Sequence, residues 1–281
     1  MVKLTTPVTA QRLPFSISLK DKVVVLGSCL SDDLGDKFRK AGFGTMVNPF
    51  GTLYNPLSIE NAINRMDSGD PYTEKDCVEM GAGAGLVCSW EHYTKFARPT
   101  AEEFLQNANA KLAEAAAFWQ HANAVIIPLY TAWVWEYQGR PVANCLKRPQ
   151  TQFDRLLLSV SEASESIRRM IAGHPEKRFV FMVCPIRQPG QPRENTLGKA
   201  TLQLAIEAAG APYFPAFEIV HDELRDYRFY ADDLVHPSQQ AVRILWERLA
   251  EAAFDPAELP AIAANEKESR ATAHRNICQK N

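Results

Sequence analysis

Two kinds of segment are missing from the 281 residues: a long apolar run and a strongly basic stretch. No apolar run approaches the roughly 18 residues needed to span a bilayer, and the N-terminus has no signal-peptide pattern. The 31 basic and 33 acidic residues leave a net charge of −2, which argues against a broad nucleic-acid footprint. We therefore expect a soluble, cytoplasmic protein with no nucleic-acid partner and no membrane span, whose oligomeric state the sequence leaves open.

Cysteine is also scarce, and its spacing excludes two further classes. The six cysteines lie at positions 29, 77, 88, 145, 184 and 278. They form no Cys-x-x-Cys pair, which favours reduced thiols over a disulfide framework or a zinc site. A P-loop, a dinucleotide-binding glycine pattern and metal-ligand spacing are missing too, so we expect neither a metal nor a cofactor.

What is present is an alternation of short apolar runs and helical patterns. We expect strands over 23–26, 45–47, 124–129, 178–183 and 213–214, and helices over 30–41, 57–66, 101–120, 153–172, 196–209 and 239–253. Ser58 and Ser238 are the expected N-caps of the helices at 57–66 and 239–253. Such alternation predicts an α/β fold, a three-layer α/β/α sandwich around a parallel sheet. We expect one domain over 1–256, with an irregular inserted lobe at about 67–100 and a loosely held polar tail over 257–281.

The stretch 22–42 places two candidate nucleophiles at one point. A β-branched strand ends at Gly27, a helix follows, and Ser28 and Cys29 stand between them at the carboxyl edge of the sheet, where α/β folds bind ligands. A helix N-terminus favours an anion, so we expect the Cys29 thiol to titrate below its free value of about 8.5. The alternative is that Cys29 is a small buried hydrophobe under a helix cap.

A candidate base precedes the last helix. Asp233 and His236 are three residues apart, so the carboxylate can accept the imidazole Nδ1 proton and leave Nε2 free. The alternative is a solvated helix start. We prefer Asp233 to its neighbour Asp232 because one residue of rotation turns Asp232 toward solvent.

Several blocks of sequence resemble a known family. They are Gly-Ser-Cys-Leu-Ser at 27–31, Asn-Pro-Phe-Gly-Thr-Leu-Tyr-Asn-Pro-Leu-Ser-Ile at 48–59, Thr-Ala-Trp-Val at 131–134, Asn-Cys at 144–145, Glu-Asn at 194–195, Lys-Ala at 199–200, and the segment 222–238 that ends in Asp-Asp-Leu-Val-His-Pro-Ser. Together they resemble the GSCFA family, which is similar to the SGNH (GDSL) esterase and acyltransferase superfamily. The resemblance implies a flavodoxin-like sheet and puts Cys29 rather than Ser28 in the nucleophile's place, although the chemistry permits either.

The same resemblance implies where a developing oxyanion would be held. The backbone N–H of Cys29 and Gly51 match two donors, and Asn144 is a substitute for a missing asparagine, with turn capping as its equal alternative. Asn48 and Tyr54 flank Gly51 as further candidate substrate-binding residues. Arg187 and Lys199 would neutralise an anionic substrate, or else form surface salt bridges.

Four positions depart from the family pattern: Tyr130, Leu146, Gln188 and Gly198. These departures are consistent with altered substrate choice or with loss of activity. Our first hypothesis is therefore an acyl-ester hydrolase or O-acyltransferase acting on a small, carbohydrate-like hydroxyl substrate. A catalytically inactive binding domain and a hydrolase that uses Ser28 alone are the alternatives.

Overall fold

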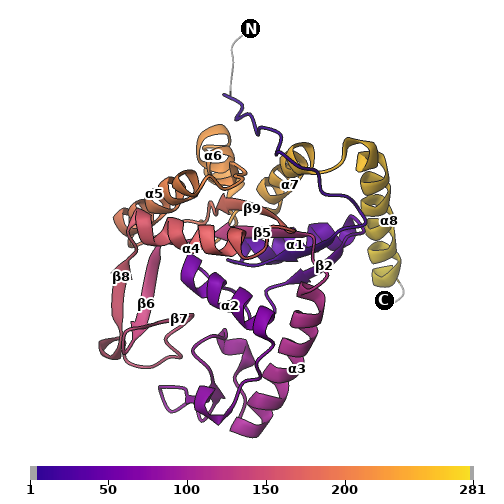
Figure 1. Ribbon diagram of the computed structural model, residues 1–281. Coiled ribbons are helices and arrows are strands. Elements are labelled where there is room, and N and C mark those ends of the chain that lie inside the picture. Colours follow the sequence, from indigo (N-terminus) through magenta and orange to yellow (C-terminus); the bar gives the residue numbers. More distant parts are fainter. Residues whose placement is uncertain (1–4, 279–281) are drawn as a thin grey trace.

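The computed structural model describes the backbone of residues 5–278 and the side chains of residues 5–272. Four parallel strands form the central sheet in the order β2-β1-β5-β9 (Figure 1). These strands are β1 (Lys22–Val25), β2 (Gly44–Val47), β5 (Ala124–Leu129) and β9 (Arg178–Val183). A parallel bridge from Phe181 to Tyr213 adds a fifth position beside β9, which completes the flavodoxin-like order that we expected.

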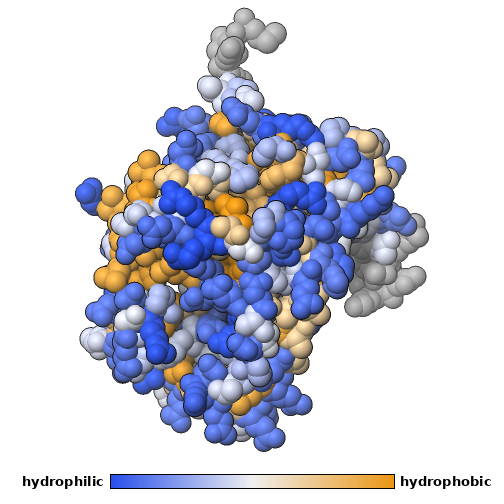
Figure 2. All heavy atoms as spheres, viewed as in Figure 1, coloured by the Kyte–Doolittle hydropathy of each residue, from blue (hydrophilic) through white to orange (hydrophobic). Residues whose placement is uncertain are grey.

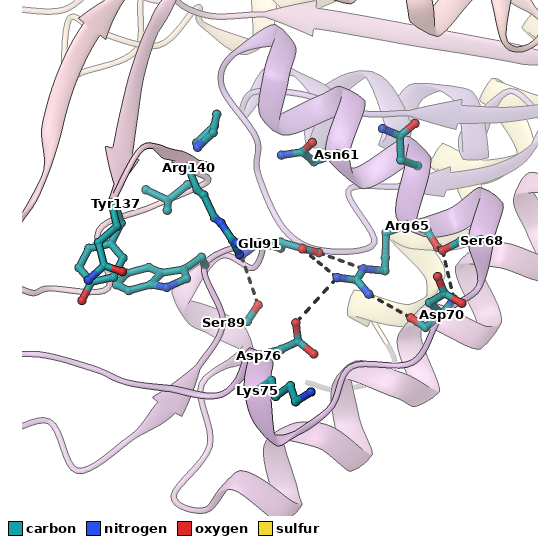
Figure 3. Close-up of a pocket in the computed structure, with 15 residues that line it drawn as sticks. Asn61, Arg65, Ser68, Asp70, Lys75, Asp76, Ser89, Glu91, Tyr137 and Arg140 are labelled. Carbon is teal, nitrogen blue, oxygen red and sulfur yellow. Dashed lines mark hydrogen bonds and ion pairs between the residues drawn. The ribbon is translucent and has the colours of Figure 1, made fainter.

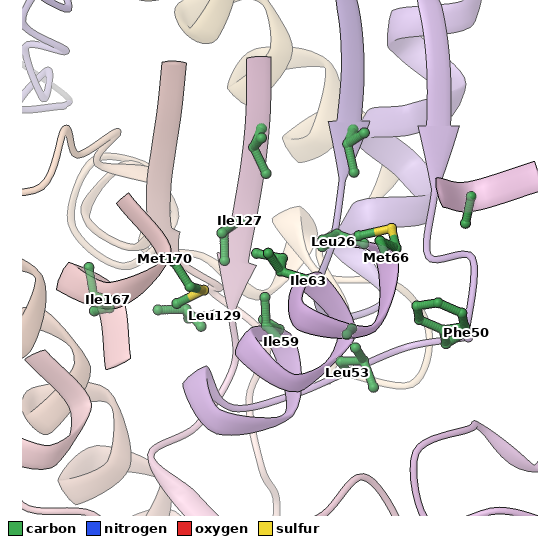
Figure 4. Packing of buried hydrophobic residues seen from close by; sticks show 14 of the residues in the cluster. Leu26, Phe50, Leu53, Ile59, Ile63, Met66, Ile127, Leu129, Ile167 and Met170 are labelled. Carbon is green, nitrogen blue, oxygen red and sulfur yellow. The ribbon is translucent and has the colours of Figure 1, made fainter. Parts of the chain in front are cut away.

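Helices cover both faces of this sheet. One face carries α2 (Pro56–Ser68), α3 (Ala101–Trp119), α4 (Val160–Ala172) and α5 (Pro192–Ala209); the other carries α1 (Leu30–Lys40), α7 (Gln239–Ala253) and α8 (Leu259–Cys278). Side chains of β1 alternate between the two cores, since Val24 joins the first cluster and Val25 the second. Figure 4 shows the first cluster, in which Ile59 and Ile63 of α2 pack beneath Ile127 of β5. The predicted three-layer α/β/α fold is confirmed.

Two small antiparallel sheets lie outside the central one. The first has the order β7-β6-β8 and consists of β6 (Trp133–Tyr137), β7 (Arg140–Val142) and β8 (Asp154–Leu157). The second pairs β3 (Val78–Glu79) with β4 (Val87–Cys88) inside the segment that we interpreted as an inserted lobe. The single helix expected over 153–172 is wrong in its first part, because Asp154–Leu157 pairs with β6. Helix α4 begins only after Ser159, which forms a capping box with Glu162.

The C-terminal region is more ordered than its polar composition indicated. Instead of a loose tail, α8 packs against the second core: Ile262 is buried, and the Asn265 side-chain amide donates to the carbonyl of Ala41 at 2.9 Å. The Trp246 indole donates to Glu266 at 2.5 Å. Residues 279–281 of the expected tail lie outside the described residues.

Helix caps agree with expectation at one site and differ at another. Ser238 caps α7 as predicted, with its hydroxyl accepting from the backbone of Ala241. Helix α2, however, begins at Pro56 and is capped by Asn55, whose Oδ1 accepts from the backbone N–H of Ser58 at 2.9 Å. The predicted cap, Ser58, is instead a buried residue within the helix.

The face shown in Figure 2 is mainly polar, with an apolar area over α5 and β8. Leu156, Leu197 and Leu204 of these two elements are exposed. Within residues 5–278, no helix has the length and apolar character that a bilayer crossing requires.

Candidate active site

The turn after β1 sets the position of the candidate nucleophile. A Cβ atom on Gly27 would lie 2.5 Å from the carbonyl oxygen of Pro128, so only glycine lets β1 end this close to β5. The Gly27 N–H donates to Oδ1 of Asn48 at 2.9 Å, and Nδ2 of Asn48 donates to Asp32 at 3.3 Å. Cys29 follows as the N-cap residue of α1. Asn48 therefore positions the turn and the first part of α1.

The candidate base lies on a loop that is fixed from two sides. The backbone N–H and the guanidinium of Arg187 donate to the carbonyls of Val235 and Leu234, at 3.0 and 2.9 Å. Oδ1 of Asp233 accepts from the backbone N–H groups of Val235 and His236, at 2.9 and 3.0 Å. This Asx-type turn holds the carboxylate and the imidazole on the same side of the loop.

Cys29 and His236, 207 residues apart in the chain, meet at the carboxyl edge of the sheet. The Cys29 Sγ lies 3.3 Å from Nε2 of His236, and Nδ1 of His236 lies 2.6 Å from Oδ2 of Asp233. Hydrogen bonds from His236 and Val235 lower the pKa of Asp233 to about 2. Because the side chains of His236 and Asp233 are 44% and 47% exposed, a substrate can reach this group from solvent.

The protonation state of Cys29 differs from the expectation. Burial, with smaller contributions from Cys184, Asp32 and Asp33, raises the pKa of the thiol to about 11, although the backbone N–H of Cys29 acts in the opposite direction. Two carboxylates in the first turn of α1 oppose the favourable field of the helix N-terminus. The expected low pKa is therefore wrong, and at neutral pH Cys29 is a thiol.

Ser28, the second candidate nucleophile, is completely buried. Within the described part of the chain its hydroxyl has no well-placed hydrogen-bond partner, and it lies beside the buried thiol of Cys184. Ser28 is thus not brought together with His236.

Of the three expected oxyanion donors, two are already engaged. The Gly51 N–H donates to the carbonyl of Asn48 at 2.8 Å, and a Cβ atom on Gly51 would lie 2.2 Å from that of Tyr93. The Asn144 amide donates to the carbonyl of His92 and accepts from the N–H of Leu146, which makes it a turn cap. Asn144 thus takes the turn-capping alternative, and the Gly51 N–H could not donate to an oxyanion without giving up its present hydrogen bond.

The N–H of Cys29 differs from those two groups. Among residues 5–272 no backbone carbonyl accepts from it, and it lies next to the thiol. It is the one expected donor that remains available to a ligand.

The two candidate cations serve the fold rather than a ligand. Lys199 is 2% exposed, and its Nζ donates to the carbonyls of Cys184 and Tyr130 at 2.5 and 3.3 Å. Burial lowers the pKa of Lys199 to about 8. Arg187 holds the loop of Asp233 and stacks 4.9 Å from the ring of Tyr227. Neither acts as the anion-neutralising residue that we expected.

A cleft of about 140 Å³ opens at the carboxyl edge of the sheet. It is lined by Tyr54, Asn55, Tyr130, Thr131, Trp133, Trp135, Val142, Ala143, Arg155 and Gln188. Burial is the main cause of the raised pKa of both Tyr54 and Tyr130, and both rings also lie within electrostatic range of Cys29.

Sequence reasoning missed several of these lining residues as site residues. Trp133 lies in one of the blocks that resemble the family, and Tyr130 and Gln188 are two of the departures from its pattern. A cluster of tryptophan and tyrosine at 130–137 was the available signal. Gly198 belongs to the same region, since a Cβ atom there would lie 2.9 Å from the Thr131 hydroxyl and 3.1 Å from the Trp133 ring.

Solved structures with some similarity include two esterases. The psychrotrophic esterase EstA from Pseudoalteromonas sp. aligns with a TM-score of 0.40 at 12% identity, over 83% of this chain and 96% of that chain. A catalytic mutant of Axe2, an acetylxylan esterase from Geobacillus stearothermophilus, aligns with a TM-score of 0.38 at 13% identity, over 86% and 98% of the two chains. No curated protein matches.

A family model gives a specific assignment. The model of the GSCFA family matches residues 22–249, which include the turn of Cys29, the block at 48–59 and the Asp233–His236 pair. Because this match spans most of the chain, the protein belongs to the GSCFA family.

Proposed function

We propose that the protein cleaves or transfers acyl esters with Cys29 as nucleophile, His236 as general base and Asp233 as the residue that orients it. The observation that carries this proposal is the unbroken contact from thiol to imidazole to carboxylate, at 3.3 and 2.6 Å. A buried serine that faces Cys184 does not fit the same role, so we assign no part of the reaction to Ser28.

The raised pKa of Cys29 determines how the attack proceeds. Because the thiol is protonated at neutral pH, His236 removes its proton as the sulfur bonds to the ester carbonyl carbon. The tetrahedral intermediate then collapses, the carbon–oxygen bond to the alcohol breaks, and the imidazolium gives its proton to the departing alkoxide. Water, or a second hydroxyl, then attacks the resulting thioester while His236 takes its proton. The carbon–sulfur bond breaks, the imidazolium returns the proton to the Cys29 sulfur, and the acid or a new ester is released.

The oxyanion is held by two donors in this proposal. The first is the backbone N–H of Cys29. The second is the hydroxyl of Tyr54, which lines the cleft beside Cys29. Burial raises the pKa of Tyr54, so it remains a protonated donor at neutral pH.

The cleft favours a ring-shaped hydroxyl substrate. Its walls include Tyr54, Tyr130, Trp133 and Trp135, and aromatic faces pack against the C–H face of a sugar ring. A volume of about 140 Å³ accommodates one small ring or a short acyl chain. We therefore propose a small acyl ester of a carbohydrate-like alcohol as substrate.

Turnover of p-nitrophenyl acetate by purified variants tests the assignment. We expect Cys29→Ala and His236→Ala each to lower kcat/KM by at least about 10³-fold, since removal of a nucleophile or its base disables the reaction. Cys77→Ala is the matched control, because this thiol is partly exposed in the 67–100 segment and is expected to have no effect. Intact-mass detection of an acyl adduct, mapped to Cys29, gives independent support. Full activity in both Cys29→Ala and His236→Ala would refute the mechanism.

A non-catalytic binding domain is the second candidate. It is favoured by the engagement of Gly51 and Asn144, which leaves fewer oxyanion donors than the family pattern implies. Absence of both turnover and an acyl adduct with a panel of acetyl, butyryl and aryl esters would select this function.

A further inference from the structure

A second and larger cavity, which shares Val142 of β7 with the cleft, is not used by the proposed reaction (Figure 3 shows this cavity). Its volume is about 980 Å³, at the upper end of the roughly 300–1,000 Å³ of ligand pockets. We propose that it binds an uncharged oligosaccharide. Residues from α2, from the 67–100 segment and from the β6–β7 hairpin line it.

The floor of this cavity is a fixed and neutralised ion pair. Arg65 donates to both carboxylate oxygens of Glu91, at 2.9 and 3.2 Å, and stacks 4.4 Å from the ring of Tyr72. The Tyr72 hydroxyl donates to Glu91 at 3.0 Å, and Figure 3 shows the Arg65–Glu91 pair at the centre of the cavity. The same guanidinium lies 3.9 Å from Asp76. A floor that is held from several sides keeps its polar groups in place before a ligand arrives.

The charges around the cavity cancel. The lining cations are Arg65, Lys75 and Arg140, and the lining anions are Asp70, Asp76 and Glu91. A strongly anionic or cationic ligand would therefore meet an equal number of like charges and gain little net attraction. Planar amides and hydroxyls, in contrast, make hydrogen bonds to a neutral polyhydroxyl ligand without a charge penalty.

Two exposed amides supply such hydrogen bonds. Asn61 and Asn64 are three residues apart on α2, so both face the cavity rim. Neither side chain has a hydrogen-bond partner within residues 5–272, and each carries two N–H donors and a carbonyl acceptor. Neighbouring hydroxyls on a sugar ring present the complementary donors and acceptors.

The opposite wall is aromatic. The rings of Trp90 and Tyr137 stack at 4.7 Å with an interplanar angle of 31°, and both line the cavity. Such a wall packs against the C–H face of a pyranose, while the amides on α2 contact its hydroxyls.

The position of the cavity connects it to the cleft at Cys29. Val142 of β7 lines both, and a narrow space lined by Pro141 and Ala143 lies between them. The two cavities are therefore neighbours that share part of one wall. This choice of ligand class rests on the proposed function, because the reaction cleft is assigned to a carbohydrate-like ester.

Calorimetric titration of the Cys29→Ala protein with linear hexasaccharides of glucose, xylose and N-acetylglucosamine tests the proposal without turnover. We expect at least one of them to bind, and the double variant Asn61→Ala/Asn64→Ala to bind it at least tenfold more weakly. Alanine is a better helix former than asparagine, so this variant is expected to fold. Asn107→Ala on α3, outside the cavity lining, is the matched control and keeps full affinity. The anionic hexamer of galacturonic acid is expected to bind more weakly than the neutral probe.

Two results would overturn the proposal: no binding by any neutral hexasaccharide, or unchanged affinity in the double variant. Turnover of p-nitrophenyl acetate is also measured for the Asn61→Ala/Asn64→Ala variant that retains Cys29. This measurement separates the proposed reaction from the proposed oligosaccharide site, because the small ester does not use the large cavity. Unchanged turnover with lost binding supports the second site. If Cys29→Ala and His236→Ala lose activity but no hexasaccharide binds, the proposed reaction is supported and the second site is refuted.

Discussion

The thiol of Cys29 shows how a residue's surroundings can reverse an argument based on its place in the chain. A cysteine at a helix N-terminus beside a histidine is expected to ionise readily. In this fold, however, burial is the largest influence and raises the pKa of Cys29 to about 11, and the two aspartates that begin α1 act in the same direction. The sequence contains Asp32 and Asp33, but it does not show how deeply the sulfur is buried.

The alkylation rate of Cys29 provides a test of this protonation state. Because the thiolate is the reactive form, we expect carbamidomethylation by iodoacetamide to be slow at pH 7 and to rise about tenfold per pH unit up to about pH 11. The rate is followed by peptide mass spectrometry, with the partly exposed Cys145 as an internal reference. A plateau already reached below pH 8 would show a preformed thiolate–imidazolium pair and contradict the stepwise proton transfer.

Tyr54 carries the second prediction for a single side chain. If its hydroxyl holds the oxyanion, Tyr54→Phe should lower kcat by about 10²-fold with little change in KM, since the lost hydrogen bond forms mainly in the transition state. Tyr227→Phe is the control, because this ring is 60% exposed and its contact with Arg187 does not need the hydroxyl. Equal kcat values for Tyr54→Phe and the wild type would remove this donor from the mechanism.

Helices and strands with a regular spacing of apolar residues could be predicted from the sequence. Those that form only because a segment distant in the sequence packs beside them could not. The strands around Val24 and Ile126 and the helix capped by Ser238 follow from local pattern. The residues of β8 alternate only weakly and become a strand because β6 lies beside them. The candidate site shows the same division, since Cys29 and His236 were foreseeable while the aromatic cleft needed the β6–β7 hairpin to be placed in space.

The start of α2 gives a prediction about one element. Asn55 accepts the N–H of Ser58, whereas the Ser58 hydroxyl is buried without a partner in the described chain. We expect Asn55→Ala to lower the free energy of unfolding by about 1 kcal/mol, the usual effect of removing an N-cap. Ser58→Ala, the matched control, is expected to be neutral or slightly stabilising because it removes an unsatisfied hydroxyl. Chemical denaturation of both variants measures the difference, and a larger loss in Ser58→Ala would restore Ser58 as the cap.

In the whole molecule, the two ends of the chain together support the helix that carries Cys29. Ile17 pairs with Phe254 in a parallel bridge, and α8 then passes the C-terminal end of α1, where Asn265 binds the carbonyl of Ala41. Two adjacent residues of α8 test this support, since Ile262 is buried and Ala263 is exposed. We expect Ile262→Asn to lower the free energy of unfolding by about 3 kcal/mol and the Tm by roughly 6–12 °C, because it places a polar amide in the second core.

The adjacent Ala263→Asn change makes the same substitution on the solvent side and should shift the Tm by no more than about 2 °C. Because α8 contacts the end of α1 opposite to Cys29, both variants are expected to keep the kcat of the folded enzyme at 20 °C. Differential scanning fluorimetry and initial rates measure the two quantities separately. Equal Tm values for the two variants would mean that α8 does not pack on the core in solution, and the stabilising role assigned to the C-terminal helix would be lost.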